Sequence, residues 1–241
     1  MLEAAAWGLM AASSLVIGSV LTFWLRPGRR LIGLIMAFGA GTLISAIAYD
    51  LVEDAAASGR ALALTAGLAL GAISFFIGDW WVDRAGGKHR KRSGGEQAQG
   101  NSFGIFIGTL LDGIPESFIL GASLVAGGGV SVAFLMAVFV SNLPEAMGAT
   151  TGMSTADWPK QRIIGIWLAV AGASAVVAAI GYALTATLSL DGVLAQAFAA
   201  GALLTMLADS MMPEAFENGG KAAGLLTVLG FAVAFALSQL A

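Results

Sequence analysis

Three acidic residues lie in the middle of long apolar stretches of the sequence. Asp112 and Glu116 fall within 102–126, and Glu145 falls within 129–153. An ionisable side chain at the centre of a bilayer costs roughly 2.5–3.5 kcal/mol on insertion scales, so each of these acids points to a function. The centres of the apolar stretches contain no basic residue that could pair with them. Each acid is therefore expected either to bind a proton or to hold a cation.

The acids belong to two similar motifs, DGIPE at 112–116 and SNLPE at 141–145. On a helix the first and last residues of each motif are four apart, so their side chains share one face with Cβ atoms about 6 Å apart. Pro115 and Pro144 cannot donate to the carbonyl four residues earlier, so each is expected to kink its helix and leave a carbonyl oxygen beside the acids. Carboxylates, the Asn142 amide, the Ser141 hydroxyl and backbone oxygens together predict an oxygen-rich site for a divalent cation.

Composition limits the class of protein that carries these motifs. The 241 residues are 58% hydrophobic and 11% charged, with a mean hydropathy of +0.85, whereas soluble domains carry about 25% charged residues. A water-soluble globule is excluded. Twelve Lys and Arg residues with a net charge of −3 do not provide a nucleic-acid surface. The sequence has no cysteine and no His-Glu-x-x-His motif, so a thiolate metal site is excluded and an enzyme is not expected.

A single transmembrane domain over 1–241 is predicted. A helix that crosses the hydrocarbon core needs about 20 apolar residues, and only helices or closed barrels satisfy the backbone in lipid. The fold class is therefore all-α, with eight transmembrane helices predicted at 4–25, 31–52, 61–84, 102–126, 129–153, 162–189, 192–214 and 221–240.

The basic residues orient this bundle. Eleven of the twelve follow the first, third, fifth or seventh span, and Arg60 is the exception. The positive-inside rule then places those loops in the cytoplasm and both termini on the extracytoplasmic side. Segment 86–101 is predicted to be a flexible, solvated, basic cytoplasmic loop between the third and fourth helices. The short loops favour a cell membrane, specifically a bacterial inner membrane.

An internal repeat is visible at a fixed offset. AFGAGTL at 37–43 matches AFAAGAL at 197–203, and Asp54-Ala55 falls on Glu214-Ala215. The second and seventh spans run in opposite directions, so we expect inverted three-helix repeats, spans 1–3 and 6–8, around spans 4 and 5. Such repeats are common in secondary transporters. Pairs of small residues are expected to allow close helix packing in lipid; they are Gly67/Gly71, Gly104/Gly108 and Gly148/Gly152.

At its paired Pro-Glu motifs the sequence resembles the ZIP family of divalent metal-ion transporters. The resemblance implies eight spans and a metal site on the fourth and fifth. By position, the implied ligands are Asp112, Glu116 and Glu145, with Asn142 and Ser141 completing the shell. The acidic ends of the second and seventh spans also resemble the family's and are expected on the ion's route, although ordinary interfacial acids are the alternative; these residues are Asp50, Glu53, Asp209 and Glu214.

The sequence departs from the family pattern at three positions. Asp112 stands where members usually have a histidine, Gly113 where they often have an asparagine, and Ser174 where members with two metals have a glutamate. Imidazole suits zinc and iron, whereas carboxylates suit manganese and magnesium. The resemblance therefore puts Zn²⁺ first, and the residues add weight to Mn²⁺, with Fe²⁺ also open.

The function expected from the residues and the resemblance is transport of a divalent metal ion into the cytoplasm. The metal is the substrate, and no prosthetic group is expected. Two alternatives stay open: a non-transporting metal sensor or scaffold derived from a transporter, and a cation channel. The expected partners are the metal ion and the lipid bilayer but no nucleic acid, and a homodimer is left open.

Overall fold

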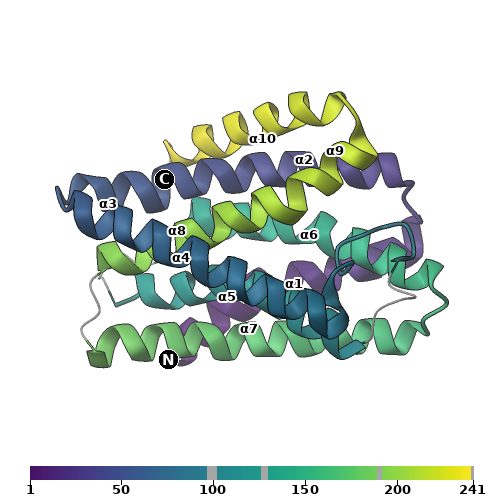
Figure 1. Cartoon of the computed structure of the whole chain (residues 1–241), viewed down its shortest axis with the longest axis horizontal. Helices are drawn as coiled ribbons and strands as arrows, with labels where there is room; N and C mark the ends of the chain where they lie inside the picture. Colours follow the sequence, from purple (N-terminus) through teal and green to yellow (C-terminus); the bar gives the residue numbers. More distant parts are fainter. Residues whose placement is uncertain (97–101, 126–129, 189–191, 240–241) are drawn as a thin grey trace.

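The computed structural model of the chain describes residues 1–96, 102–125, 130–188 and 192–239. The chain is 88% helical, with no strand among those residues, and it forms eight helical passes (Figure 1). Five passes are single helices: α1 (Leu2–Leu25), α5 (Ser102–Ser123), α6 (Val132–Thr155), α7 (Lys160–Leu188) and α10 (Ala222–Ser238).

The other three passes combine α-helix with a π-helical segment. The second pass consists of α2 (Arg29–Ala46), the π-helix η1 (Ile47–Glu53) and α3 (Asp54–Ala57). The third consists of α4 (Ala61–Val82) and the π-helix η2 (Asp83–Gly87). The seventh consists of α8 (Gly192–Met206), the π-helix η4 (Leu207–Met211) and α9 (Met212–Gly219).

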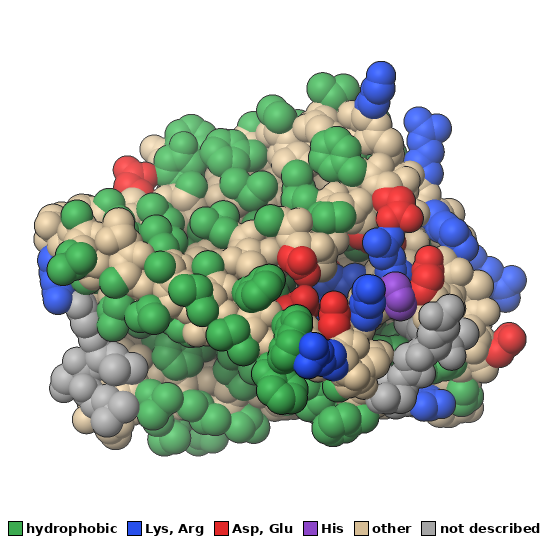
Figure 2. Space-filling model, in the orientation of Figure 1, with side chains coloured by type: hydrophobic (Ala, Val, Ile, Leu, Met, Phe, Trp, Pro, Cys, Tyr) green, Lys and Arg blue, Asp and Glu red, His purple; other side chains and the backbone are tan. Residues whose placement is uncertain are grey.

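The eight predicted helices are confirmed. In the described part of the chain, seven passes are long and apolar enough to cross a membrane, and α10 is shorter at 17 residues. At 1.5 Å per residue, α10 is about 26 Å long. Both termini lie toward one end of the bundle (Figure 1), as an even number of passes requires, and most Lys and Arg side chains gather at the other end (Figure 2).

The helices form two groups of four. In the first group, α1 packs against α6 and α7, and α5 packs against α7. In the second group, α2 packs against α10, and α4 packs against α8. The groups meet where α2 contacts α6 and where α5 contacts α8. These pairings stay the same when α1 is exchanged with α7, α2 with α8, α4 with α10, and α5 with α6.

The closest helix–helix contacts, which are made at glycines, occur in pairs related by the same exchange of helices. A Cβ at Gly41 of α2 would overlap the carbonyl oxygen of Thr227 in α10, and one at Gly201 of α8 would overlap that of Leu68 in α4. The π-helices also correspond, because η1 and η4 begin at Ile47 and Leu207, separated by the offset that separates the matching segments 37–43 and 197–203. The glycines let the backbones approach closely, as small residues do in membrane helices.

We expect Gly201→Ala to destabilise the protein because its new methyl group would collide with the Leu68 carbonyl. Gly172→Ala is the matched control, since a Cβ there meets nothing within 4 Å and alanine favours the helix. The midpoint of thermal unfolding in detergent should fall for Gly201→Ala and stay level or rise for Gly172→Ala. Equal midpoints for the two variants would contradict the close approach of α4 and α8.

Candidate functional site

Helices α5 and α6 bring four of the predicted ligands together inside the bundle. Asp112 and Glu116 lie on consecutive turns of α5, and Asn142 and Glu145 lie on α6. All four side chains are buried, with exposed fractions of 2%, 3%, 7% and 4% in that order. One lysine ammonium lies between Asp112 and Glu145. The two Pro-Glu motifs therefore converge on one buried, acidic point.

The remaining residues of the motifs have less direct positions. Ser141 is buried, but its hydroxyl donates to the Val138 carbonyl oxygen at 3.0 Å within α6, and α2 packs against its Cα at Gly39. Its role as a ligand stays a prediction. Pro115 and Pro144 both lie inside their helices, so neither can donate a hydrogen bond to the turn before it.

The segment that follows η2 returns into the bundle. Gly86, with φ of +92°, occupies the left-handed region that glycine adopts without strain, and there the chain turns away from the α4 axis. We call residues 88–93 the basic loop. Arg90, Lys91 and Ser93 of this loop are buried, with exposed fractions of 3%, 5% and 2%. The prediction of a solvated loop is wrong for these residues, and residues 97–101 of the same segment lie outside the described structure.

Arg90 pairs with Asp112 through one edge of its guanidinium group. Its Nε lies 2.8 Å from Asp112 Oδ2, and its Nη2 lies 2.9 Å from Asp112 Oδ1. The same Nη2 lies 2.5 Å from Asp79 of α4, and Nη1 lies 3.9 Å from Asp83. Bidentate pairs of this kind are among the strongest hydrogen-bonded contacts in proteins. The expectation that the buried acids have no basic partner is therefore wrong, because the partner comes from the loop and not from a span.

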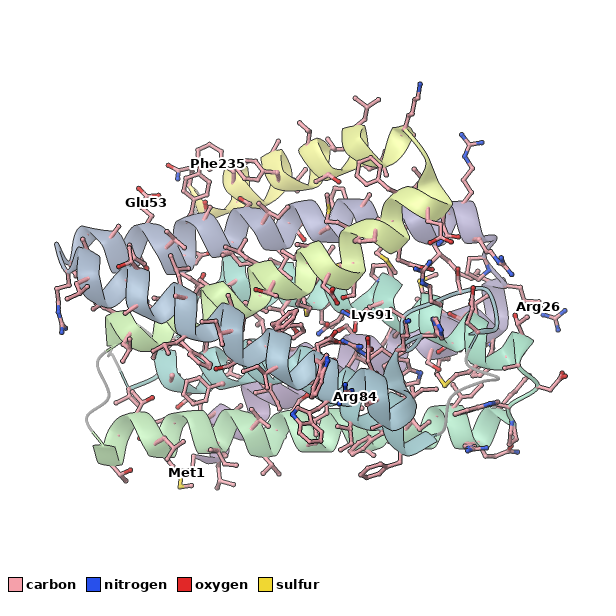
Figure 3. All side chains as sticks on the ribbon, viewed as in Figure 1. Met1, Arg26, Glu53, Arg84, Lys91 and Phe235 are labelled. Carbon is pink, nitrogen blue, oxygen red and sulfur yellow. The ribbon has the colours of Figure 1, made fainter. Side chains whose placement is uncertain are left out.

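Lys91 bridges the two helices more loosely. Its Nζ lies 3.3 Å from Asp112 Oδ2 and 3.4 Å from Glu145 Oε2. Figure 3 shows Lys91 among the helices of the bundle. Burial acts to lower the pKa of Lys91, but the negative charges of Asp112 and Glu145 outweigh burial and hold that pKa above its ordinary value. The ammonium is thus charged at neutral pH and stands at the centre of the predicted site.

The basic loop is anchored at its far end by Glu214 of α9. The Glu214 carboxylate accepts hydrogen bonds from the Ser93 backbone N–H and hydroxyl, both at 3.1 Å, and from the Asn218 amide at 2.7 Å. Arg92 pairs with Glu214 and with Glu217. Beyond the loop, the carbonyl of Gly94 accepts a hydrogen bond from Arg29 of α2. Glu214, which was expected on the ion's route, therefore holds the loop in place.

Three glycines provide the room that the basic loop and η2 occupy. A Cβ at Gly104 would collide with the backbone at Ala85 and Gly86, and one at Gly108 would overlap the Arg90 side chain. A Cβ at Gly148 of α6 would lie 3.1 Å from the Lys91 carbonyl oxygen. Gly104 packs against η2 and Gly108 against Val82 of α4, as the prediction of helix packing requires, and Gly108 also makes room for Arg90 of the loop. Gly67 and Gly71 do pack against α8, as predicted.

The other acidic candidates lie at the two ends of the bundle. Asp209 and Glu214 line a cavity of about 210 Å³ at the basic end, between the loop and the η4–α9 segment, together with Asp83. At the opposite end Asp50 accepts a hydrogen bond from Ser131 at 3.1 Å, and Glu53 is exposed (Figure 3). These positions match the predicted ends of the second and seventh passes, and a role in an ion's route stays a prediction.

In this arrangement the carboxylates hold protein cations. Within the described residues, no group of three or more His, Cys, Asp or Glu side chains is arranged to hold a metal ion. Arg90 pairs with Asp112, and the Lys91 ammonium lies between Asp112 and Glu145. Sequence reasoning missed Asp79, Arg90 and Lys91. Two features of the sequence indicated them: three acids in apolar spans without a basic partner there, and the KHRKR run that ends 20 residues before Asp112.

Comparison of the chain with models of protein families finds no match, and comparison with curated protein sequences finds none either. The resemblance described above therefore rests on the motifs at 112–116 and 141–145 and on the spans around them. The geometry supports a narrower conclusion about chemistry: α5 and α6 form a buried anionic site that binds positive charge.

Removing Arg90 should destabilise the protein, since an ion pair broken on one side leaves a buried charge uncompensated at a cost of roughly 3–5 kcal/mol. For a chain of this length we expect Arg90→Met to lower the midpoint of thermal unfolding by at least about 6 °C. The double variant Arg90→Met/Asp112→Asn should recover part of that loss. Lys88→Met, which removes an exposed charge from the same loop, is the control. No recovery in the double variant would contradict the pairing of Arg90 with Asp112.

Proposed function

We propose that this protein transports a divalent metal ion across a membrane through a site formed by Asp112, Glu116, Asn142 and Glu145. The observation that carries the proposal is the convergence of the two Pro-Glu motifs at a buried point that already binds positive charge. Three carboxylates in an apolar bundle are stable only when protonated or paired with cations. Two protein cations contact Asp112 and Glu145 here, and a dication would supply the same charge.

The ligand chemistry narrows the substrate. The site consists of carboxylate and amide oxygens, with no imidazole or thiolate among its members. Oxygen ligands suit harder ions such as Mn²⁺, whereas the resemblance to ZIP transporters favours Zn²⁺, with Fe²⁺ between the two. Ser174 lies beside the site on α7, because its Oγ is 3.6 Å from where a Cβ on Gly113 would be. A hydroxyl there is a weak ligand, so we propose one metal rather than two.

The packing supports an inverted repeat of the kind found in secondary transporters. The exchange that relates α1 to α7, α2 to α8 and α4 to α10 also relates α5 to α6. The candidate site therefore lies between the two helices that this pseudo-two-fold exchange interchanges, where such transporters bind substrate. This position favours a carrier over a channel, because a carrier opens the same site to each side in turn.

The positive-inside rule gives the proposed orientation. The basic end of the bundle faces the cytoplasm, and both termini lie on the extracytoplasmic side of a bacterial inner membrane. Asp50 and Glu53 would then lie on the side from which the ion arrives, and Asp209 and Glu214 on the side to which it leaves. The cavity lined by Asp209 and Glu214 supports a cytoplasmic release route.

The buried basic loop also favours a second candidate function. A membrane metal sensor could use the same carboxylates to bind the ion and release the loop, without any flux. Saturable flux distinguishes the carrier from both the sensor and a channel, since a sensor gives none and a channel gives flux that rises nearly in proportion to ion concentration.

The test is metal uptake into proteoliposomes, measured for Zn²⁺, Fe²⁺ and Mn²⁺. We expect saturable uptake for the wild type and at least a tenfold loss for Glu116→Gln/Glu145→Gln, because amides bind dications far more weakly than carboxylates. The control is Glu3→Gln, which removes an exposed acid near the N-terminus and should leave uptake unchanged.

Uptake that persists in the double variant would place the site elsewhere. Metal binding without uptake by the wild type would support the sensor instead.

A further inference from the structure

The Lys91 ammonium occupies the position at which the proposed metal ion would bind. Its Nζ lies between Asp112 Oδ2 and Glu145 Oε2, at 3.3 Å and 3.4 Å, and so contacts one ligand from each helix. The described groups that face it are Asp112 and Glu116 of α5, Glu145 of α6, and Arg90 of its own loop. A dication bound by the same carboxylates cannot be present while the ammonium is there.

Lys91 is held less firmly than its neighbour Arg90. The Arg90 contacts with Asp112 and Asp79 are 2.9 Å or shorter, whereas both Lys91 contacts exceed 3.2 Å. The Lys91 Nζ is also one of the buried polar atoms, among those described, without a well-formed hydrogen bond. A charged donor with this geometry keeps Coulomb attraction but little directional bonding, which makes it exchangeable for another cation.

Several residues of the bundle make room for the basic loop or hold it in the position in which Lys91 contacts Asp112 and Glu145. Gly108 leaves room for Arg90, and Gly148 leaves room for the Lys91 backbone. At its far end the loop is fastened to α9 by Ser93 and Glu214. The loop thus connects the α5–α6 site in one group of helices with α9, which belongs to the other group.

We propose that Lys91 is a tethered competitor of the transported ion: the Lys91 ammonium and the divalent metal occupy the α5–α6 site in turn, and metal binding expels the basic loop. This inference rests on the proposed function. Because the loop is at the proposed cytoplasmic end, its return displaces the ion toward the side of release. The tethered ammonium then compensates Asp112 and Glu145 while no metal is bound.

The first test measures metal affinity by titration calorimetry with Zn²⁺ and Mn²⁺ on the full chain in detergent. Lys91→Met keeps the length of the side chain and removes the competing charge, so the dissociation constant should fall at least tenfold. Lys88→Met removes a lysine from the same loop that is exposed, and it should change the constant by less than twofold. An unchanged or weaker affinity of Lys91→Met relative to Lys88→Met would overturn the proposal.

The second test leaves Lys91 in place, so it stands even where Lys91→Met fails to fold. The chain has no cysteine, so Ser93→Cys creates a single thiol at a site that is 2% exposed. Zn²⁺ and Mn²⁺ should each accelerate its modification by a maleimide at least fivefold, because the loop leaves the bundle. Ser58→Cys, which is exposed at the other end, should react equally with and without metal. A rate for position 93 that metal does not change would overturn the proposal.

The two proposals fail differently. If the wild type binds metal, and Glu116→Gln/Glu145→Gln does not, but Lys91→Met and the labelling rate show no effect, the competition is wrong and the site stands. If neither the wild type nor Lys91→Met binds any of the metals, the proposed function is wrong, and the competition is overturned with it.

Discussion

Compensation of buried negative charge is the constraint on which the rest of this structure depends. Asp112, Glu116 and Glu145 are buried inside an apolar bundle of helices, and an unpaired carboxylate is costly there. The basic loop meets this requirement for Asp112 and Glu145 by folding inward. Its docked position in turn requires glycines on α5 and α6, a left-handed glycine after α4, and a buried glutamate on α9.

The pattern of helix contacts relates the two helices that carry the acidic residues. The contacts keep the same pattern when α5 is exchanged with α6 and the other helices are exchanged with their partners, and the similar motifs on α5 and α6 converge on one point. Among the described residues, the basic loop enters this site from one end of the bundle only. The two ends of the site therefore differ in charge. In the proposed function, that difference favours release of the ion at one end.

The helices were predictable from the sequence because long apolar runs are governed by local composition. Where the predicted boundaries fall on described residues, they agree with the observed helix ends to within about five residues, and the boundaries at 126, 129, 189 and 240 lie outside the described residues. The clustering of Asp112, Glu116, Asn142 and Glu145 was also predictable, since four-residue spacing fixes a shared face. The basic loop was not, because its residues show no periodicity, and Arg90 pairs with Asp112, which lies 22 positions later in the sequence.

The π-helix η4 sets the direction in which the side chains of α9 point. A π turn contains one residue more than an α turn, so the face presented by every later residue is rotated by about 100° relative to an uninterrupted helix. Glu214 lies three residues beyond η4, and its carboxylate accepts hydrogen bonds from Ser93. A shift of η4 to α-helical hydrogen bonding would rotate the Glu214 side chain by about 100° away from Ser93 while the helix itself stayed folded. The register of this one helical turn thus links the seventh pass to the attachment of the basic loop at Glu214.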